Sequence, residues 1–467
     1  MRYPLDTLDQ TIFRAYDIRG IVGEALTGSS VYHLGRAFAA QSRSQGVTEV
    51  AVAADGRLSS PELKQRLSEG LRDGGCDVLD VGFVATPLLY FAAHHRPEKT
   101  GVMITGSHNP ANYNGFKMMI DGTTLSGDTI QLLKQRILDQ DYLPVEQEGR
   151  HAEQDIRPAY LDYVLNDITL ATPMKVVVDC GNGIPGDVAP GLIEQLGCEV
   201  TPLFCEVDGN FPNHHPDPGK PANLVDMIAE VKTQQADLGL AFDGDGDRVG
   251  VVTESGKIIY PDRVAMLLAE DILSRNPGAE IIYDVKCSRL LAEVIRKAGG
   301  KATMWKTGHS LIKGKMKESG ALLAGEMSGH IFFKERWFGF DDGLYAAARL
   351  LEILAARKLN GETADQVFDA YPEDISTPEL NIDVSETAKF TIVEQLQQQS
   401  FAGGELNCID GVRVDYPDGW GLVRASNTTP VLVLRFEAQT EAALDRIRTD
   451  FQQRLHAVDP ALTIPAS

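Results

Sequence analysis

Paired cysteines, long apolar runs and an excess of positive charge are all missing from this sequence. Its six cysteines are scattered without a Cys-x-x-Cys pair, which argues against both a disulfide framework and a zinc cluster. No run reaches the roughly 18 apolar residues of a membrane span, and residues 1–10 contain no apolar core like that of a signal peptide. We therefore expect a cytoplasmic protein with reduced thiols.

Basic residues are outnumbered by acidic ones. The chain has 44 Lys and Arg against 66 Asp and Glu, a net charge of −22. This balance disfavours nucleic acid or an anionic membrane as a partner, so any anion site must be built locally. The 467 residues exceed what one core usually serves, and they suggest roughly three or four domains.

One sequence pattern occurs three times. A β-branched strand ends at an aspartate, namely Asp55, Asp179 or Asp284, and a helix signal follows. Each unit then has a second strand, roughly 40 to 65 residues later, that ends in a loop dense in functional residue types. These loops are Thr105–Pro110, Asp243–Arg248 and Gly325–His330. All three loops follow the carboxyl ends of predicted strands, where ligand-binding loops gather in sheets of this kind.

The repeats set the expected domain organisation. They predict three similar α/β domains with mixed sheets over 1–153, 154–254 and 255–368. After about residue 368, strand-like runs, the first over 406–416, precede one helix, which predicts a C-terminal α+β domain over 369–467. Inside the first unit, Ser60-Pro61 and Thr86-Pro87 look like helix caps followed by first-turn prolines.

Three carboxylates alternate with glycine in the segment Asp243–Arg248. Such close like charges repel unless a cation neutralises them, and hard oxygen ligands suit Mg²⁺ or Ca²⁺ rather than zinc. The aspartates also match positions one, three and five of a Ca²⁺-binding loop. Position six, where that loop needs glycine, is Arg248, and strand-like runs flank the segment instead of helices. A non-enzymatic Ca²⁺-binding module is therefore the weaker interpretation.

Two further segments contain candidate catalytic or anion-binding residues. Ser107 lies in a turn after the strand 101–105, but Asn109 stands where the nucleophile elbow of an acyl hydrolase has glycine. The segment Arg424–Thr428 offers a guanidinium, hydroxyls and an amide to an oxyanion. A hydroxyl nucleophile, a carboxylate metal loop and an arginine together fit phosphoryl transfer better than acyl transfer.

The motifs of this chain resemble those of the α-D-phosphohexomutase superfamily, in its phosphomannomutase/phosphoglucomutase branch, over essentially the whole length. They are Phe13–Gly20, Thr105–Pro110, Asp243–Arg248, Gly325–His330 and Arg424–Thr428. The resemblance implies four domains around a central active-site cleft. It also implies transfer of phosphate between the 1- and 6-positions of glucose or mannose phosphates, through a phosphoserine and a hexose 1,6-bisphosphate. Mg²⁺ would be bound by Ser107, Asp243, Asp245 and Asp247.

The resemblance also implies roles for the other site residues. The expected catalytic residues are Ser107, His108, Lys117, Arg19, Arg248 and His309. The expected substrate-binding residues are Tyr16, Lys286, His309, Glu326, Ser328, His330, Arg424, Ser426, Asn427 and Thr428. Lys117 and His309 are the candidates for general acid or base, although Lys117 could serve purely as a cation beside the phosphoserine.

Two related activities compete with this interpretation. The glucosamine branch typically has Gln where this chain has Met327, which favours the mannose and glucose branch. A metal-dependent sugar phosphatase could use the same serine, metal loop and cations if water reached the phosphoserine. We expect hexose 1- and 6-phosphates as the only partners of a monomer.

Overall fold

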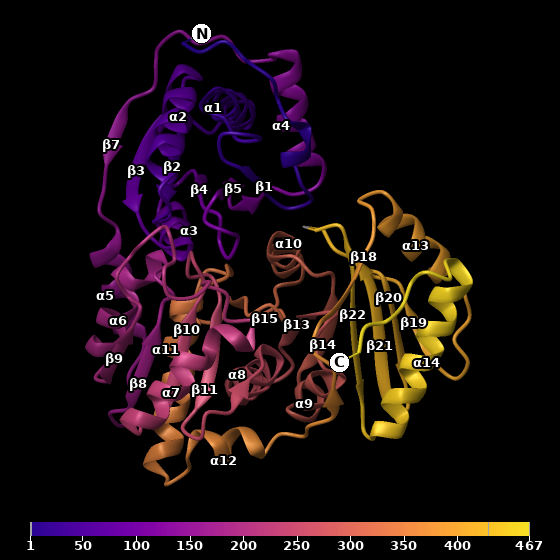
Figure 1. The fold of residues 1–467 in the computed structure, drawn as a ribbon. Coiled ribbons are helices and arrows are strands. Elements are labelled where there is room, and N and C mark those ends of the chain that lie inside the picture. The colour runs from indigo at the N-terminus through magenta and orange to yellow at the C-terminus, as the bar shows by residue number, and fades with distance from the viewer. Residues whose placement is uncertain (1, 428, 467) are drawn as a thin grey trace.

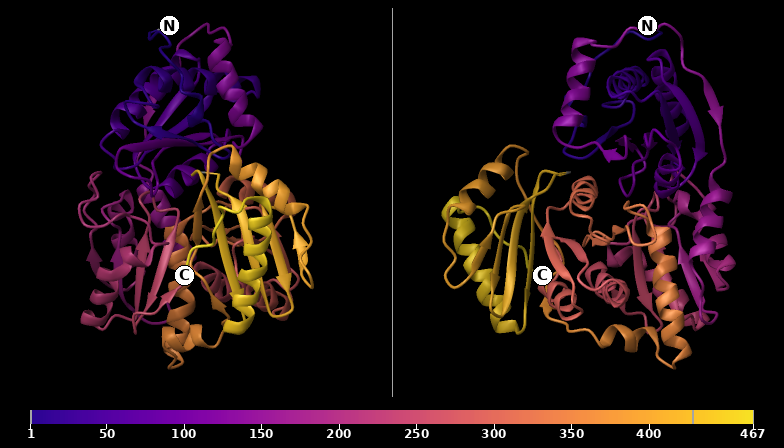
Figure 2. Two further views of the ribbon diagram at one scale, coloured as in Figure 1. Left: turned by 45° about the vertical axis from the view of Figure 1, so that its right-hand side comes forward. Right: turned by 180° about the vertical axis from the view of Figure 1, so that it is seen from behind.

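The computed structural model describes residues 2–427 and 429–466. Four β-sheets follow one another along the chain, each accompanied by its own helices (Figure 1). The second, third and fourth domains lie in a row, and the first domain lies above them (Figures 1 and 2). This arrangement confirms the predicted fold class of three α/β domains and a C-terminal α+β domain.

The first sheet is mixed and has the order β1-β5-β4-β2-β3-β7, with β6 paired to β5. Its strands are β1 (Ile18–Ile21), β2 (Glu49–Ala54), β3 (Asp77–Phe83), β4 (Gly101–Ile104), β5 (Tyr113–Ile120), β6 (Thr123–Thr124) and β7 (His151–Glu153). Its helices are η1 (Gln10–Ile12), α1 (Gly28–Ser44), α2 (Ser60–Asp73), α3 (Thr86–His94) and α4 (Asp128–Asp139). Parallel β2 and β4 end at the same edge, where the loop with Ser107 begins.

The second sheet has the order β12-β11-β10-β8-β9. Its strands are β8 (Lys175–Asp179), β9 (Glu199–Leu203), β10 (Leu238–Phe242), β11 (Val249–Thr253) and β12 (Ile258–Ile259). The helices are α5 (Arg157–Asp167), η2 (Ile184–Asp187), α6 (Ala189–Gln195), η3 (Pro221–Leu224) and α7 (Val225–Gln234). Because β12 pairs with β11, this sheet continues past residue 254, the proposed end of the second domain.

The third sheet has the order β14-β13-β15-β16. Its strands are β13 (Glu280–Asp284), β14 (Lys301–Trp305), β15 (Leu323–Gly325) and β16 (Ile331–Phe333). The helices are α8 (Pro261–Arg275), α9 (Arg289–Lys297), α10 (His309–Ser319), α11 (Gly343–Leu359) and α12 (Ala364–Asp369). As in the second sheet, two parallel strands lie beside an antiparallel pair whose connection carries functional residues.

The fourth sheet is antiparallel, with the order β17-β22-β21-β20-β19 and β18 paired to β22. Its strands are β17 (Ile375–Ser376), β18 (Leu380–Asp383), β19 (Glu405–Asn407), β20 (Val412–Tyr416), β21 (Gly419–Ala425) and β22 (Val431–Ala438), and its helices are α13 (Ala388–Gln397) and α14 (Glu441–Val458). The prediction of a single strand over 406–416 is wrong, because two strands, β19 and β20, occupy this run. Gly411, at φ +89, turns the chain between β19 and β20, and this turn carries Asp410.

The hydrophobic cores divide the molecule unevenly. One cluster joins the second and third domains to α3 and to part of the sheet of the first domain, which also has a core of its own. The fourth domain has a separate core, and a small apolar contact of Val285 with Trp420 and Leu422 links it to the third domain. The first three domains are thus packed together more extensively than the fourth is packed against them.

The predicted N-cap positions of two helices are each wrong by one residue. α2 begins at Ser60 and α3 at Thr86, so both residues lie inside their helices. Their hydroxyls donate to carboxylates, Ser60 to Asp55 at 2.6 Å and Thr86 to Asp245 at 2.5 Å. Both side chains serve the site instead of the helix ends. Among the residues described, no helix combines the length and apolar character needed to cross a bilayer.

Candidate active site

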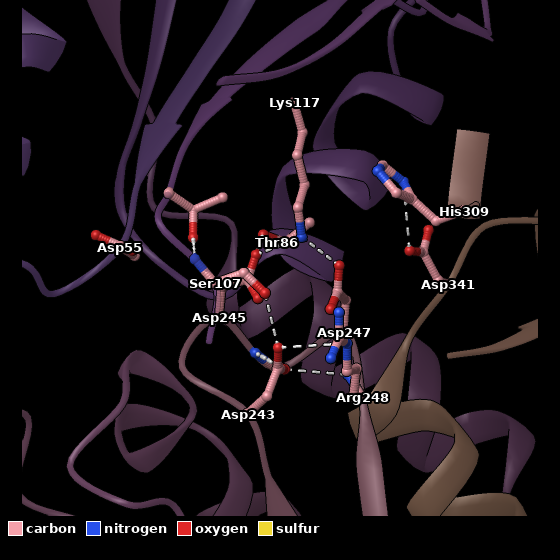
Figure 3. Close-up of polar contacts among 12 residues, drawn as sticks. Asp55, Thr86, Ser107, Lys117, Asp243, Asp245, Asp247, Arg248, His309 and Asp341 are labelled. Carbon is pink, nitrogen blue, oxygen red and sulfur yellow. Dashed lines mark hydrogen bonds and ion pairs between the residues drawn. The ribbon is translucent and has the colours of Figure 1, made fainter. Parts of the chain in front are cut away.

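Ser107 lies in the loop after β4 and is buried, with 2% of its surface exposed. Its backbone has φ +48, a left-handed conformation that is unusual for serine and is often found at functional sites. The hydroxyl donates to Asp243 Oδ2 at 2.9 Å (Figure 3). His108 Nδ1 lies 3.2 Å from Ser107 Oγ. Arg57 supports the loop by donating to the Ser107 carbonyl at 2.7 Å.

The loop Asp243–Arg248, here called the Asp loop, connects β10 to β11 and packs directly against the serine loop. A Cβ atom on Gly244 would lie 2.4 Å from the Ser107 carbonyl oxygen, so a larger residue would push the loops apart. Gly246 has φ +77, which glycine adopts without strain. The glycines therefore allow the close approach that brings Ser107 onto the first carboxylate.

The three aspartates of the Asp loop form a group that could bind a metal ion. Carboxylate oxygens of Asp243, Asp245 and Asp247 lie within 4.8 Å of one another, and all three residues are fully buried. Buried Asp245 Oδ1 has no hydrogen-bond partner in the described part of the chain, and the Oδ1 atom of Asp247 has an ion-pair contact with His330 Nε2 at 3.3 Å. Burial, together with repulsion from the other two carboxylates, raises the pKa of Asp243 well above its usual value. Three carboxylates that offer hard oxygens and need positive charge fit a divalent cation such as Mg²⁺.

Lys117 on β5 brings a positive charge from the first domain to the same carboxylates. Its Nζ lies 2.7 Å from Asp245 Oδ2 and also contacts Asp247 (Figure 3). Burial alone would lower the pKa of Lys117, but Asp245 and Asp247 raise it well above the usual value. This ion pairing favours the second of the roles expected for Lys117, a fixed cation, over a proton acceptor.

Two arginines expected at the site pair with different carboxylates. Arg248 Nε is 3.8 Å from Asp243 Oδ2, so its charge faces the Asp loop. Arg19 instead pairs with Asp17 at 2.5 Å. Burial, followed by the charges of Arg248 and Arg19, lowers the pKa of His108 well below its usual value. His108 is therefore a neutral ring beside the Ser107 hydroxyl.

The expected sugar-binding residues surround His330. Glu326 Oε2 lies 3.3 Å and Ser328 Oγ 2.9 Å from His330 Nδ1. Although burial opposes charge on the ring, Asp247 Oδ1 at 3.3 Å from Nε2 helps raise the pKa of His330 to about 9. Arg248 Nε also lies 3.3 Å from Nε2, a distance that would suit a neutral acceptor. We favour the charged ring because two carboxylates contact it.

The segment Arg424–Pro430, here called the Arg424 loop, connects β21 to β22. Asp410 binds Arg424 Nε at 3.2 Å, while Arg424 Nη2 is buried without a partner among the described residues. Asn427 donates to the Tyr16 hydroxyl at 2.6 Å, which links the fourth domain to the first. The Ser426 hydroxyl lies 2.8 Å from that of Thr429, and Thr428 falls outside the described residues.

Lys286 and His309 complete the set expected from the sequence. Lys286 forms an ion pair with Glu379 at 3.1 Å between the third and fourth domains. His309 begins α10, and its ring centroid lies 6.4 Å from that of Tyr16 and 5.8 Å from that of His330. The structure therefore gathers residues from all four domains at one place.

Sequence reasoning missed several residues that contact this site. Thr86 binds Asp245, Arg57 supports the serine loop, and a buried pair of Lys313 and Asp341 lies beside His309. Lys313 could have been found, because it stands four residues after His309 in a helical pattern. Nothing in the local sequence around Asp341 indicates that it packs against α10.

Comparison with known proteins agrees with this geometry. The four domains described as phosphoglucomutase/phosphomannomutase alpha/beta/alpha domains I, II and III and C-terminal domain match residues 10–143, 158–256, 260–373 and 379–453. The chain belongs to the phosphoglucomutase/phosphomannomutase family. The family expected from the motifs is thereby confirmed. Members of this family are Mg²⁺-dependent isomerases, in keeping with the acidic group of the Asp loop.

Individual members of the phosphoglucomutase/phosphomannomutase family align with nearly the whole chain. A phosphomannomutase/phosphoglucomutase of Pseudomonas aeruginosa is 62% identical over 460 residues, covering 98% of each chain. A phosphoglucomutase of Neisseria gonorrhoeae is 55% identical over 449 residues, 96% of this chain and 97% of that one. The crystal structure of a family member from Burkholderia thailandensis superposes with a TM-score of 0.93 at 51% identity, covering 98% of this chain and 100% of that chain.

Proposed function

We propose that this protein interconverts hexose 1-phosphates and 6-phosphates of glucose and mannose through a phosphoserine at Ser107. The observation that carries the proposal is the contact of the Ser107 hydroxyl with Asp243 at 2.9 Å, inside a group of buried carboxylates and beside buried cations. Phosphoryl transfer needs mainly positioning and charge neutralisation, and this site supplies both. The match to relatives named for both sugars supports the choice of substrates.

The reaction exchanges one bond to phosphorus for another. The phosphorus–oxygen bond to Ser107 breaks as the same phosphorus bonds to a free hydroxyl of the sugar phosphate. The hydroxyl gives up its proton, and the serine oxygen regains one. His108 is suited to exchange a proton with that oxygen, because its neutral ring lies 3.2 Å away. The product is a hexose 1,6-bisphosphate, which turns round and returns its other phosphoryl group to Ser107.

The metal would be bound by Asp243, Asp245, Asp247 and an oxygen at Ser107. When bound, Mg²⁺ neutralises charge on the transferring phosphoryl group. Lys117 and Arg248 add positive charge to the same region, as a phosphoserine of about −1.5 to −2 charge beside three carboxylates requires. Lys117 is buried, and the side chain of Arg248 is 13% exposed.

The remaining residues are proposed to bind substrate. Glu326 and Ser328 would bond to sugar hydroxyls that glucose and mannose share, which allows both sugars. Arg424, Ser426 and Asn427, with Thr428, would bind the phosphate that is distant from Ser107, because Arg424 presents a buried guanidinium nitrogen without a partner. Tyr16, Lys286 and Arg19 would add contacts from the first and third domains.

The test is the product formed from glucose 1-phosphate and from mannose 1-phosphate with Mg²⁺ and a trace of the bisphosphate. We expect the corresponding 6-phosphates, and intact-mass analysis that finds phosphate on Ser107. Ser107→Ala is expected to lower kcat by about 10⁴-fold or more, because it removes the nucleophile. Ser44→Ala, an exposed serine of the same domain, is the matched control.

Three results would reject the proposal in different ways. Net release of inorganic phosphate would identify a sugar phosphatase. Turnover confined to glucosamine phosphates would place the chain in the glucosamine branch. Full interconversion by Ser107→Ala would exclude the phosphoserine itself.

A further inference from the structure

Lys313 is a buried cation outside every motif that the proposed function uses. It lies four residues after His309 on α10, and its Nζ is 2.8 Å from Asp341 Oδ1, 3.0 Å from the Tyr90 hydroxyl and 3.2 Å from His309 Nδ1. Its side chain is 9% exposed and that of Asp341 is 0% exposed. A lysine without solvent must direct its three donors at defined acceptors, and these three atoms are the acceptors available.

The protonation state of Lys313 determines whether His309 Nδ1 carries a hydrogen. Burial alone would lower the pKa of Lys313, but Asp341 and Tyr90 raise it, so the amine is an ammonium. An ammonium donates hydrogen bonds and accepts none. His309 Nδ1, at 3.2 Å, must therefore present its lone pair to Lys313. The competing acceptor for a proton on Nδ1 is Asp341 Oδ2, at 3.7 Å, which is beyond hydrogen-bond distance.

The His309 ring is neutral in this environment. Burial, followed by the positive charges of Lys313 and Lys117, lowers the pKa of His309 well below its usual value. His309 is also the first residue of α10, and the helix dipole disfavours a cation at this end of a helix. The other titratable groups facing it are Tyr16, His330, Asp247 and Asp341. A neutral imidazole whose Nδ1 accepts a hydrogen bond carries its proton on Nε2.

We propose that Lys313 is a positioning residue that fixes His309 as the neutral Nε2–H tautomer, so that Nε2 donates a hydrogen bond to an oxygen of the hexose phosphate. Nε2 is buried and has no partner among the described residues, as expected of a donor reserved for substrate. The proposal rests on the proposed function for the identity of the substrate. It replaces the general acid or base role expected for His309 with that of a fixed donor.

Removing the ammonium reverses the preference of the ring. In Lys313→Met, Asp341 loses its cation partner, and His309 Nδ1 becomes the nearest donor to it. The proton is then expected to move to Nδ1, and Nε2 becomes an acceptor that faces phosphate or hydroxyl oxygens. The unpaired Asp341 carboxylate also favours the charged form of the ring. The pKa of His309 is therefore expected to be higher in Lys313→Met than in the native protein. Lys313→Arg keeps a cationic donor and is expected to keep the native tautomer.

The experiment is ¹⁵N NMR of the full-length protein labelled on histidine, with the His309 signals assigned from His309→Gln. Ring-nitrogen shifts distinguish a protonated from an unprotonated nitrogen. We expect native His309 to show hydrogen on Nε2 alone and no titration near neutral pH, and Lys313→Met to show hydrogen on Nδ1. Lys315→Met, on the same helix and paired with Glu318, is the matched control and is expected to leave the signals unchanged.

The kinetic counterpart separates positioning from a general loss of structure. Losing one donor to substrate corresponds to a rise in KM of about 10-fold in Lys313→Met, with recovery in Lys313→Arg. The proposal is overturned if native His309 carries hydrogen on Nδ1, or if Lys313→Met remains folded with the native tautomer. The NMR result does not depend on turnover, so it stands even where the assay rejects the proposed function.

Discussion

The Asp loop and the Arg424 loop both deal with phosphate charge, but they are attached to the molecule in different ways. The Asp loop joins two strands of the large core shared by the first three domains, and its aspartates are 0% exposed. The Arg424 loop belongs to a domain with its own core. It meets the first domain through the hydrogen bond from Asn427 to Tyr16. One region is built into the packed interior. The other belongs to a domain that is joined to its neighbours by polar contacts and by the small apolar contact of Val285 with Trp420 and Leu422.

This difference matches what the proposed reaction demands of each region. Chemistry at phosphorus needs groups held in place, which dense packing around the Asp loop provides. A bisphosphate that turns round must be released at one end and then bound again. The bonds of Asn427 to Tyr16 and of Lys286 to Glu379 can break without opening a hydrophobic core. We therefore expect the fourth domain to move as a lid while the Asp loop stays still.

Asp243→Asn is expected to have the largest effect on the rigid side of the comparison. It removes a metal ligand and the charge that accepts the Ser107 hydroxyl bond, so we expect kcat to fall by about 10³-fold and Mg²⁺ to bind more weakly. Steady-state kinetics and Mg²⁺ titration measure both effects. Removing metal with EDTA should abolish turnover of the native protein, and added Mg²⁺ should restore it.

The matched control for this change is Asp226→Asn, an exposed aspartate on α7 of the same domain. It should leave the rate and the Mg²⁺ requirement unchanged. A native rate in Asp243→Asn would mean that the Asp loop is not the metal site.

Arg424→Ala tests the other side of the comparison. Losing a charge-assisted pair to phosphate is worth about 2 kcal/mol, so we expect KM to rise about 30-fold. Because no contact joins the described residues of the Arg424 loop to Asp243, Asp245 or Asp247, the affinity for Mg²⁺ should stay unchanged. Arg446→Ala, an exposed arginine on α14 that pairs with Asp418, is the control. An unchanged KM, or a changed Mg²⁺ affinity, would break the proposed division between the two regions.

The two regions also differ in how much of them could be predicted from the sequence. The aspartates alternate over a few residues, so their pattern alone indicated a cation site, and the flanking strands were confirmed as β10 and β11. Thr86 and Lys117 reach the same carboxylates from the first domain. Lys117 was identified through the family resemblance, whereas Thr86 was taken for a helix cap, because the partner of a hydroxyl far along the chain leaves no local signal.

The surroundings of the Arg424 loop were harder to predict. Its residues were identified from the motif, but the partners Asp410 and Glu379 were not. Asp410 lies in a turn within a run that was expected to be one continuous strand. Contacts of this kind depend on how whole domains meet, and sequence periodicity carries no information about that.

Thr86→Val sharpens the comparison by loosening the rigid region without removing a metal ligand. Valine keeps the shape of threonine at the start of α3 but gives up the 2.5 Å bond to Asp245. Groups that orient metal ligands typically contribute 10- to 100-fold in affinity, so we expect Mg²⁺ to bind about 10-fold more weakly. Mg²⁺ titration at fixed substrate measures this, and Thr86→Ser, which keeps the hydroxyl, is the control. Equal Mg²⁺ affinity in the valine and serine variants would show that the Asp loop holds its shape alone.

Tyr16→Phe is expected to have the smallest effect, and it addresses the link between the fourth and first domains. The change removes the oxygen that accepts from Asn427 at 2.6 Å and leaves the ring in place beside His309. One such bond is worth about 1 kcal/mol, so KM should rise by about 5-fold.

If the fourth domain moves as a lid, the variant should also sample more open arrangements, visible as a broader distance distribution between spin labels on the first and fourth domains. Tyr163→Phe, an exposed tyrosine on α5, controls for the loss of a phenol, since no contact joins Tyr163 to the described residues of the Arg424 loop. A higher KM with an unchanged distance distribution would make Tyr16 a substrate contact only. The fourth domain would then be held by its contacts with the third domain, such as Lys286 with Glu379 and Arg413 with the Val285 carbonyl.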